Sequence, residues 1–159
     1  MAINFDKFDK MVNTEDLKKQ INAAPDNSPV PKGRYICTFD KMELKETKDG
    51  KGILFASQLR IKENLDGKGQ INRVIFFNRK IFGNTPNSKG TWNDGVAIKG
   101  VESWLKKLQT ETEPNFETYA QFAENVEDIF NEIKGAIEVE ISYDDKEFNS
   151  ITINEVYDI

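Results

Sequence analysis

Apolar and polar residues alternate along three segments after residue 33, which predicts three consecutive strands. These segments cover residues 34–46, 53–64 and 71–82. Both connections contain the dipeptide Asp-Gly, at 49–50 and 66–67, which favours tight turns because both residues tolerate positive φ. The third segment is long for a strand, so we expect a bend or bulge within it. The pattern as a whole predicts an antiparallel meander.

After a polar loop at 83–95, apolar residues recur at intervals of three and four, which is typical of helices. Strict alternation then returns near the C-terminal end of the sequence, which predicts a final hairpin. The predicted elements of this part are helices at 97–109 and 116–134, the second ending before Gly135, and strands at 137–143 and 148–156.

The predicted order is therefore three strands, a helical insertion and two more strands. This is the order of elements in an OB-type five-stranded barrel. A closed sheet would also have no exposed edges. We predict a mainly β protein with helices, of the α+β class: an OB-like five-stranded antiparallel barrel with a helical insertion between strands 3 and 4. An open antiparallel sheet with helices on one face is the alternative, and element order does not decide between them.

The first 31 residues differ from the rest in composition. Asn13 is a candidate N-cap for a helix at 14–24, and a proline-rich stretch at 25–31 cannot continue that helix. We predict an N-terminal helical arm with a proline-rich linker at 1–31, followed by one OB-like domain at 32–159.

Composition narrows the classes of function. The 159 residues include no histidine and one cysteine, Cys37. Histidine-dependent catalytic triads, the commonest zinc ligands and thiolate zinc clusters are thereby excluded, as is a disulfide within the chain. Carboxylates and lysines remain as candidate catalytic groups, and paired acids are expected by chance among 27 of them. We therefore predict a protein that is not an enzyme and that needs no cofactor or metal.

The sequence contains no eighteen-residue apolar run, and its first residues lack the apolar stretch of a signal peptide. We expect a protein of a reducing cytoplasm that does not associate with membranes, with Cys37 as a small core residue.

Charge is distributed unevenly along the chain. Residues 31–108 carry 16 Lys or Arg and 8 Asp or Glu, a net charge of +8. Residues 109–159 carry 2 Lys and 14 Asp or Glu, a net charge of −12. We expect a basic face and an acidic face on one domain. Chance clustering of solubilising charges is the alternative.

The third strand carries the most informative pattern. One register places Val74 and Phe76 in the core and leaves Arg73, Phe77 and Arg79 outward. The opposite register would bury both arginines, which is costly, so we predict the first. An outward row of arginine and aromatic side chains suits single-stranded nucleic acid, because guanidinium groups pair with phosphates and rings stack on bases. The alternative is that both faces are buried, with the charged groups at the strand ends.

Nearby segments extend this predicted surface. Arg60 and Lys62 share the polar side of the second strand, Lys45 and Lys48 lie near the first hairpin turn, and Trp92 lies in a polar loop. Trp92 either anchors that loop to the rest of the protein or stacks on a ligand. The alternative for the lysines is that they only make the protein soluble. The predicted nucleic-acid-binding residues are Lys45, Lys48, Arg60, Lys62, Arg73, Phe77, Arg79, Lys80 and Trp92.

Several segments resemble one family of small phage-encoded proteins that carry a domain of unknown function. They are Val30-Pro31-Lys32-Gly33-Arg34-Tyr35, Lys41-Met42-Glu43-Leu44-Lys45, Ile61-Lys62-Glu63-Asn64-Leu65-Asp66-Gly67, Arg73-Val74-Ile75-Phe76-Phe77-Asn78 and Asn149-Ser150-Ile151. Members are found among phage replication and recombination genes and are suspected to be OB-fold single-stranded DNA-binding proteins. The resemblance covers roughly residues 30 to 82 and 135 to 157. It implies the host cytoplasm as the location, but no site residues.

We therefore expect a sequence-independent single-stranded DNA-binding protein that acts in phage replication or recombination. Phage or host proteins of those processes are candidate partners, and exchange of the N-terminal arm would produce a homodimer. The alternative function is a protein-interaction module that recruits or inhibits a host protein through its acidic C-terminal half.

Overall fold

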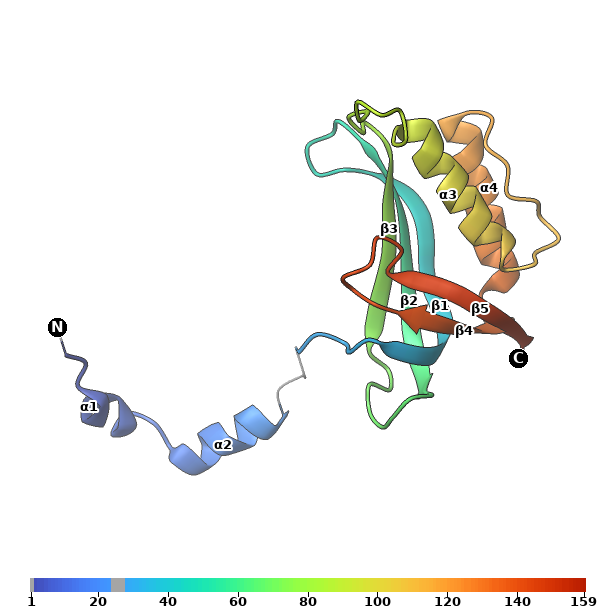
Figure 1. Ribbon diagram of the computed structural model, residues 1–159. Coiled ribbons are helices and arrows are strands. Elements are labelled where there is room, and N and C mark those ends of the chain that lie inside the picture. The colour runs from blue at the N-terminus through green and yellow to red at the C-terminus, as the bar shows by residue number, and fades with distance from the viewer. Residues whose placement is uncertain (1, 24–27) are drawn as a thin grey trace.

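Five antiparallel strands form one sheet in the order β3-β2-β1-β4-β5 (Figure 1). This is a computed structural model, which describes residues 2–23 and 28–159. The strands are β1 (Gly33–Glu46), β2 (Ile53–Asn64), β3 (Val74–Phe82), β4 (Ile137–Tyr143) and β5 (Ile151–Asp158). The predicted five-stranded antiparallel sheet of an α+β protein is confirmed. β3 begins later than predicted, since Gln70 and Asn72 take φ values of 68° and 67° that do not fit a strand.

β1 is long because it pairs with two neighbours over different parts of its length. Its first residues, Gly33–Cys37, pair with β4, whereas its pairing with β2 continues to Glu46. Register shifts at Ile36/Cys37 and Phe39/Lys41 interrupt the β1–β2 ladder, and such bulges bend a strand. β4 and β5 consequently cross the three longer strands in Figure 1.

β3 and β5 are the two edges of this sheet, and no strand pairing joins them in the part of the chain that the structure describes. Side-chain hydrogen bonds nevertheless connect β3 with the loop that precedes β5. The Ser150 hydroxyl donates to the Phe76 carbonyl over 3.4 Å, and the Arg79 Nη2 group donates to the Phe148 carbonyl over 3.2 Å. The edges therefore contact each other through loop 144–150, which connects β4 to β5.

Two helices lie between β3 and β4 in sequence, as predicted, and pack side by side on one face of the sheet (Figure 1). α3 (Asp94–Lys106) begins earlier than predicted because the Asn93 side chain caps it, accepting a hydrogen bond from Val96 N–H. α4 (Tyr119–Ile133) begins later because Thr118 is its N-cap. Gly135 follows it with a φ of 70°, the left-handed conformation that favours glycine after a helix. Within the described ranges, no helix is long and apolar enough to span a membrane.

The N-terminal segment contains two short helices, α1 (Phe5–Asp9) and α2 (Thr14–Ala23), and neither has a buried residue. Asn13 caps α2 as predicted, since its side chain accepts from Glu15 N–H and Asp16 N–H. α1 was not predicted. Residues 24–27 lie outside the described residues. They include Ala24, the predicted end of the helix at 14–24, and the first part of the predicted linker.

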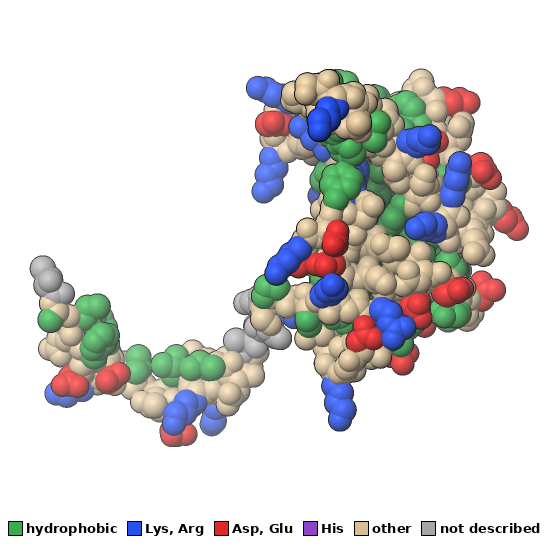
Figure 2. All heavy atoms as spheres, viewed as in Figure 1, with side chains coloured by type: hydrophobic (Ala, Val, Ile, Leu, Met, Phe, Trp, Pro, Cys, Tyr) green, Lys and Arg blue, Asp and Glu red, His purple; other side chains and the backbone are tan. Residues whose placement is uncertain are grey.

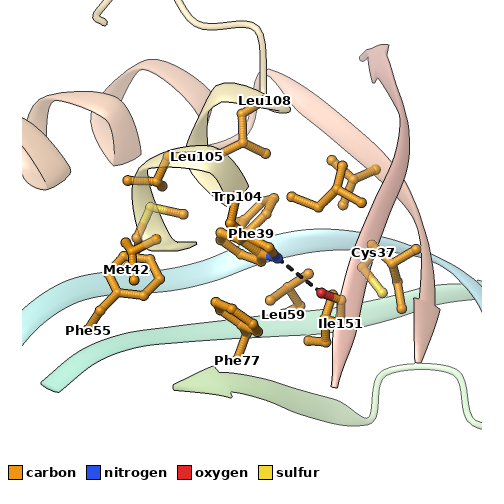
Figure 3. Close-up of a cluster of buried hydrophobic side chains, with 14 of the residues drawn as sticks. Cys37, Phe39, Met42, Phe55, Leu59, Phe77, Trp104, Leu105, Leu108 and Ile151 are labelled. Atoms are coloured by element: carbon orange, nitrogen blue, oxygen red, sulfur yellow. Dashed lines mark hydrogen bonds between the residues drawn. The ribbon is translucent and has the colours of Figure 1, made fainter. Parts of the chain in front are cut away.

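Trp104 of α3 is at the centre of the core (Figure 3). Its ring stacks on Phe77, with centroids 4.5 Å apart, and meets Phe39 and Phe55 edge-on at 5.9 Å. Its indole N–H donates to the Ile151 carbonyl of β5 over 3.1 Å. One side chain thus joins α3 to four strands. Cys37 is fully buried, as predicted, and burial raises the pKa of its thiol to about 12.

Candidate nucleic-acid interface

The side of β2 that faces away from the core is the centre of the candidate surface. Phe55, Leu59 and Ile61 are fully buried beneath the helices. Gln58 and Arg60 alternate with them and point to the opposite side, as the sequence predicted. We call this side of β1, β2 and β3 the outer face.

The register predicted for β3 is wrong. Phe77 is 3% exposed and Phe76 is 54% exposed, so Phe77 points into the core and Phe76 lies on the outer face. The stacked contact of Phe77 with Trp104 explains this outcome. Burying a large ring against another ring stabilises the fold by more free energy than leaving it partly exposed would. Phe77 consequently cannot stack on a base, and Phe76, which the sequence prediction placed in the core, has an accessible ring.

The two arginines that favoured the wrong register are accommodated in different ways. Arg73 precedes β3, so strand alternation does not govern it, and its guanidinium donates to the Gln70 side chain and the Ser28 carbonyl. Arg79 does point inward, and it is 9% exposed. Its Nη2 group donates to the Phe148 carbonyl and to Asn149 Oδ1, which offsets part of the cost of burying the charge.

Phe76 borders a hollow of about 120 Å³ on the outer face. In the sheet register Phe76 lies opposite Gln58, which lies opposite Lys41 of β1. The hollow thus combines an exposed ring, amide groups, Lys45, and an ion pair between Lys41 and Glu43 at 3.5 Å. Its lining residues are Lys41, Glu43, Lys45, Ala56, Ser57, Gln58, Phe76 and Asn78.

The predicted basic residues differ in their availability for a ligand. Lys45, Lys48 and Lys62 are exposed, and of these Lys45 lines the hollow. Arg60 is occupied within the protein: its guanidinium lies 2.7 Å from Asp40 Oδ2, and it donates to the Asn72 carbonyl. Lys80 is half-buried.

Lys80 lies near the carboxylates of Asp49 and Asp94 at the end of the sheet. Its charge contributes to lowering the pKa of Asp49, although the hydrogen bonds from Thr47 and from Lys51 N–H are the larger causes. Its aliphatic stem lies against Gly52 and Gly83. Lys80 therefore lies near acidic groups of the protein itself, although neither Lys80 nor Lys45 is part of an ion pair among the described residues.

Trp92 is held in its loop but is not fully covered. Asn87 Oδ1 accepts hydrogen bonds from the backbone N–H groups of Thr91 and Trp92, which fixes the loop. The Trp92 ring is half-buried and meets Phe148 edge-on, with centroids 5.0 Å apart. The anchoring role is thus present, and part of the ring remains accessible.

The uneven charge of the sequence is also visible on the surface (Figure 2). The end of the body that carries the β1–β2 turn shows mainly Lys and Arg. The side formed by α4, β4 and β5 shows mainly Asp and Glu, and Glu124, Glu127 and Asp128 are exposed on α4. No group of three or more carboxylate or cysteine side chains within the described ranges is arranged to hold a metal ion.

Comparisons with protein-family models, with curated proteins and with solved structures found nothing that matches this chain. The function is therefore argued from the surface described above. Of the residues that line its hollow, only Lys45 was among the predicted site residues, and Lys41, Gln58, Phe76 and Asn78 were not. The register of β3 places Phe76 and Asn78 on the outer face. Lys41 lies on the same face because it pairs with Gln58.

Proposed function

We propose that this protein binds single-stranded DNA, without sequence preference, on the outer face of β1, β2 and β3. The observation that carries the proposal is the exposed ring of Phe76, which borders a hollow beside Lys41 and Lys45. Every base has a π-face that can stack on such a ring, so stacking is tolerant of sequence. Lys45, which is in no ion pair among the described residues, pairs with phosphates, which are present at every nucleotide.

A duplex fits this surface less well than a single strand does. Stacked and paired bases have no free face for Phe76, so a duplex would bind only through its phosphates. Gln58 and Asn78 line the hollow beside the ring. The Gln58 Nε2 group donates to Asp40 and Asn78 Oδ1 accepts from Ser57 N–H, which leaves Gln58 Oε1 to accept from a base edge and Asn78 Nδ2 to donate to one. We therefore expect preference for single strands.

The strand order also supports the proposal. An OB barrel is a partly open five-stranded Greek-key barrel, whose strands 2 and 3 and whose loops 1–2 and 4–5 bind oligonucleotides. Here β3 and β5 are the edges, and contacts from loop 144–150 link them. We propose that the sheet is an OB-like barrel left open between β3 and β5. From the resemblance to phage proteins, we propose that this activity serves replication or recombination.

A second candidate function is recruitment of another protein by the acidic side of the molecule. The exposed carboxylates of Glu124, Glu127 and Asp128 on α4 favour it, since none of them is in an ion pair in the described part of the chain. Enrichment of one host protein from nuclease-treated lysate, lost when these three residues are changed to Gln or Asn, would support this function.

Fluorescence anisotropy of a labelled oligothymidine, titrated at several salt concentrations, tests the proposed function. A duplex of equal length is the competing ligand. We expect tighter binding to the single strand and a log–log salt slope of about −0.7 per phosphate neutralised. Phe76→Ala should weaken single-strand binding about 5- to 100-fold and leave the slope unchanged, because no charge is lost.

Tyr157→Ala is the matched control, since Tyr157 is an exposed aromatic residue on β5, away from the outer-face hollow. It should bind as the unchanged protein does. Absence of binding to the oligothymidine at low salt would contradict the proposed function.

A further inference from the structure

Three side chains from separate parts of the chain meet beside the edge of β3. Phe148 belongs to loop 144–150, Trp92 to the loop between β3 and α3, and Arg79 to β3 itself. The Arg79 guanidinium carbon lies 3.9 Å from the centroid of the Phe148 ring and 6.0 Å from that of Trp92. Phe148 and Trp92 meet edge-on at 5.0 Å. We call these three residues the Arg79 cluster.

Phe148 is 66% exposed, although it is a large apolar side chain. The guanidinium lies over one face of the ring, and most of the side chain nevertheless remains accessible to solvent. The edge-on contact with Trp92 limits how the ring can turn. An exposed ring held in a fixed orientation is the kind of group on which a nucleic-acid base stacks.

Arg79 is a buried cation without a negative partner. No ion pair within the described ranges includes it, and its Nη2 group donates only to a carbonyl and an amide oxygen. Burial accordingly lowers the pKa of its guanidinium. Its Nε and Nη1 groups make no hydrogen bond with described residues. Neither group is fully buried. They therefore keep contact with solvent.

An anion at this position would relieve the cost of burying the charge. A phosphate oxygen accepts from a guanidinium in a planar geometry that matches its forked donors. The positions of the ring and the cation thus match the two chemical parts of a nucleotide, the base and the phosphate.

The Arg79 cluster also lies next to the outer face. The Ser150 hydroxyl, in the same loop as Phe148, donates to the carbonyl of Phe76 over 3.4 Å. A strand bound at Phe76 therefore needs only to pass the edge of β3 to reach Phe148.

We propose that the Arg79 cluster is a second nucleotide-binding station, in which Phe148 stacks on a base and Arg79 binds a phosphate. A single strand then runs from the outer-face hollow at Phe76 around the edge of β3 to Phe148. This inference rests on the proposed function, because the ligand is the same single-stranded DNA.

Phe148 is the residue to change, because it is exposed in a loop and its truncation leaves no core cavity. Oligothymidine of about 12 nucleotides, within the range that one OB fold binds, is the probe for anisotropy titrations. Phe148→Ala should weaken binding about 5- to 100-fold, and Phe148→Tyr, which keeps the ring, should bind within about threefold of the unchanged protein. Tyr157→Ala is again the control, and urea unfolding of each variant verifies that the fold is retained.

Tryptophan fluorescence provides a second readout. Trp92 is half-buried beside the station, whereas Trp104 is 5% exposed in the core. Saturation with oligothymidine should change the emission of the unchanged protein, and Trp92→Phe should abolish most of that change.

The outcomes separate the two proposals. If Phe148→Ala binds as tightly as the unchanged protein while Phe76→Ala loses affinity, the outer face binds DNA and the second station is overturned. If Phe148→Tyr loses as much as Phe148→Ala, the ring does not act by stacking, which also overturns it. If no form binds oligothymidine at low salt, the proposed function itself fails and the station with it.

Discussion

Phe76 and Phe77 are adjacent in the sequence and identical in chemistry, yet they lie on opposite faces of β3. Phe77 is stacked on Trp104 within the core, whereas Phe76 borders a polar hollow at the surface. Burial gives the first a role in stability, and exposure leaves the second available to a ligand. The comparison shows that two identical neighbours on one strand lie in different environments, because neighbouring side chains must point to opposite faces.

The largest effect is expected from Phe77→Ala, which tests the core side of the comparison. Truncation removes the stacked contact with Trp104 and the edge-on contact with Phe55. The free energy of unfolding should fall by about 3–5 kcal/mol, as for other buried phenylalanines. Urea unfolding measures this fall. Phe76→Ala is the matched control and should change it by less than about 0.5 kcal/mol.

Equal losses of stability in these two variants would contradict the assigned faces of β3. A larger loss in Phe76→Ala would restore the register that the sequence alone favoured.

The next effect concerns the surface side and separates stacking from simple apolar contact. Phe76→Leu keeps an apolar side chain but removes the ring, and it should reduce the free energy of oligothymidine binding by about 1–3 kcal/mol. Phe76→Trp should retain the affinity, since a larger ring also stacks. Anisotropy titrations compare the two. Loss of affinity in Phe76→Trp but not in Phe76→Leu would exclude stacking at this position.

A smaller effect, on the free energy of unfolding, is expected from replacing a polar residue on the core side of β2. Ser57 Oγ, on β2, is fully buried and has no hydrogen-bond partner among the described residues. Ser57→Ala removes the cost of burying this hydroxyl and should raise the free energy of unfolding by about 1 kcal/mol. Ser142→Ala is the control that should not stabilise, because Ser142 Oγ accepts a hydrogen bond from Asn154 over 2.9 Å. Destabilisation by Ser57→Ala in a urea titration would contradict this interpretation.

The smallest effect is expected from the charges of the outer face. Lys45→Gln should make the salt slope of oligothymidine binding shallower by about 0.7, the contribution of one phosphate. Affinity at moderate salt should fall by about two- to fivefold. Arg60→Gln should change the slope less, because the Arg60 guanidinium is already paired with Asp40 at 2.7 Å. A larger slope change in Arg60→Gln would show that DNA displaces Asp40.

Several elements could be predicted from local sequence because local interactions determine them. The turn at Asp49-Gly50, the Asn13 cap and Gly135 after α4 each depend on residues a few positions away. The turn at Asp66-Gly67 was predicted less well, because the positive φ values of that connection are at Gly69, Gln70 and Asn72. The faces of β2 were also predicted correctly, since polar Gln58 and Arg60 alternate with apolar Leu59 and Ile61 in its second half. β3 has no such alternation at its centre, because Phe76 and Phe77 are adjacent apolar residues.

The candidate site was predicted only in part for the same reason. Lys45 lines the outer-face hollow, whereas Arg60 is paired with Asp40 and Phe77 is buried. The argument against burying Arg79 failed because its partners lie far away in sequence. The carbonyl that accepts from Arg79 belongs to Phe148, 69 residues further along the chain.

The sequence by itself determined the order of the elements, the turns between the strands and the period of two along each strand. Only the tertiary structure decided which side of β3 is covered. Trp104 reaches that side from α3, and loop 144–150 brings Phe148 over Arg79. Alternation defines two faces of a strand, but the free energy that chooses between them comes from contacts between residues distant in sequence. Those contacts exist only once the helices and the last hairpin have packed on the meander.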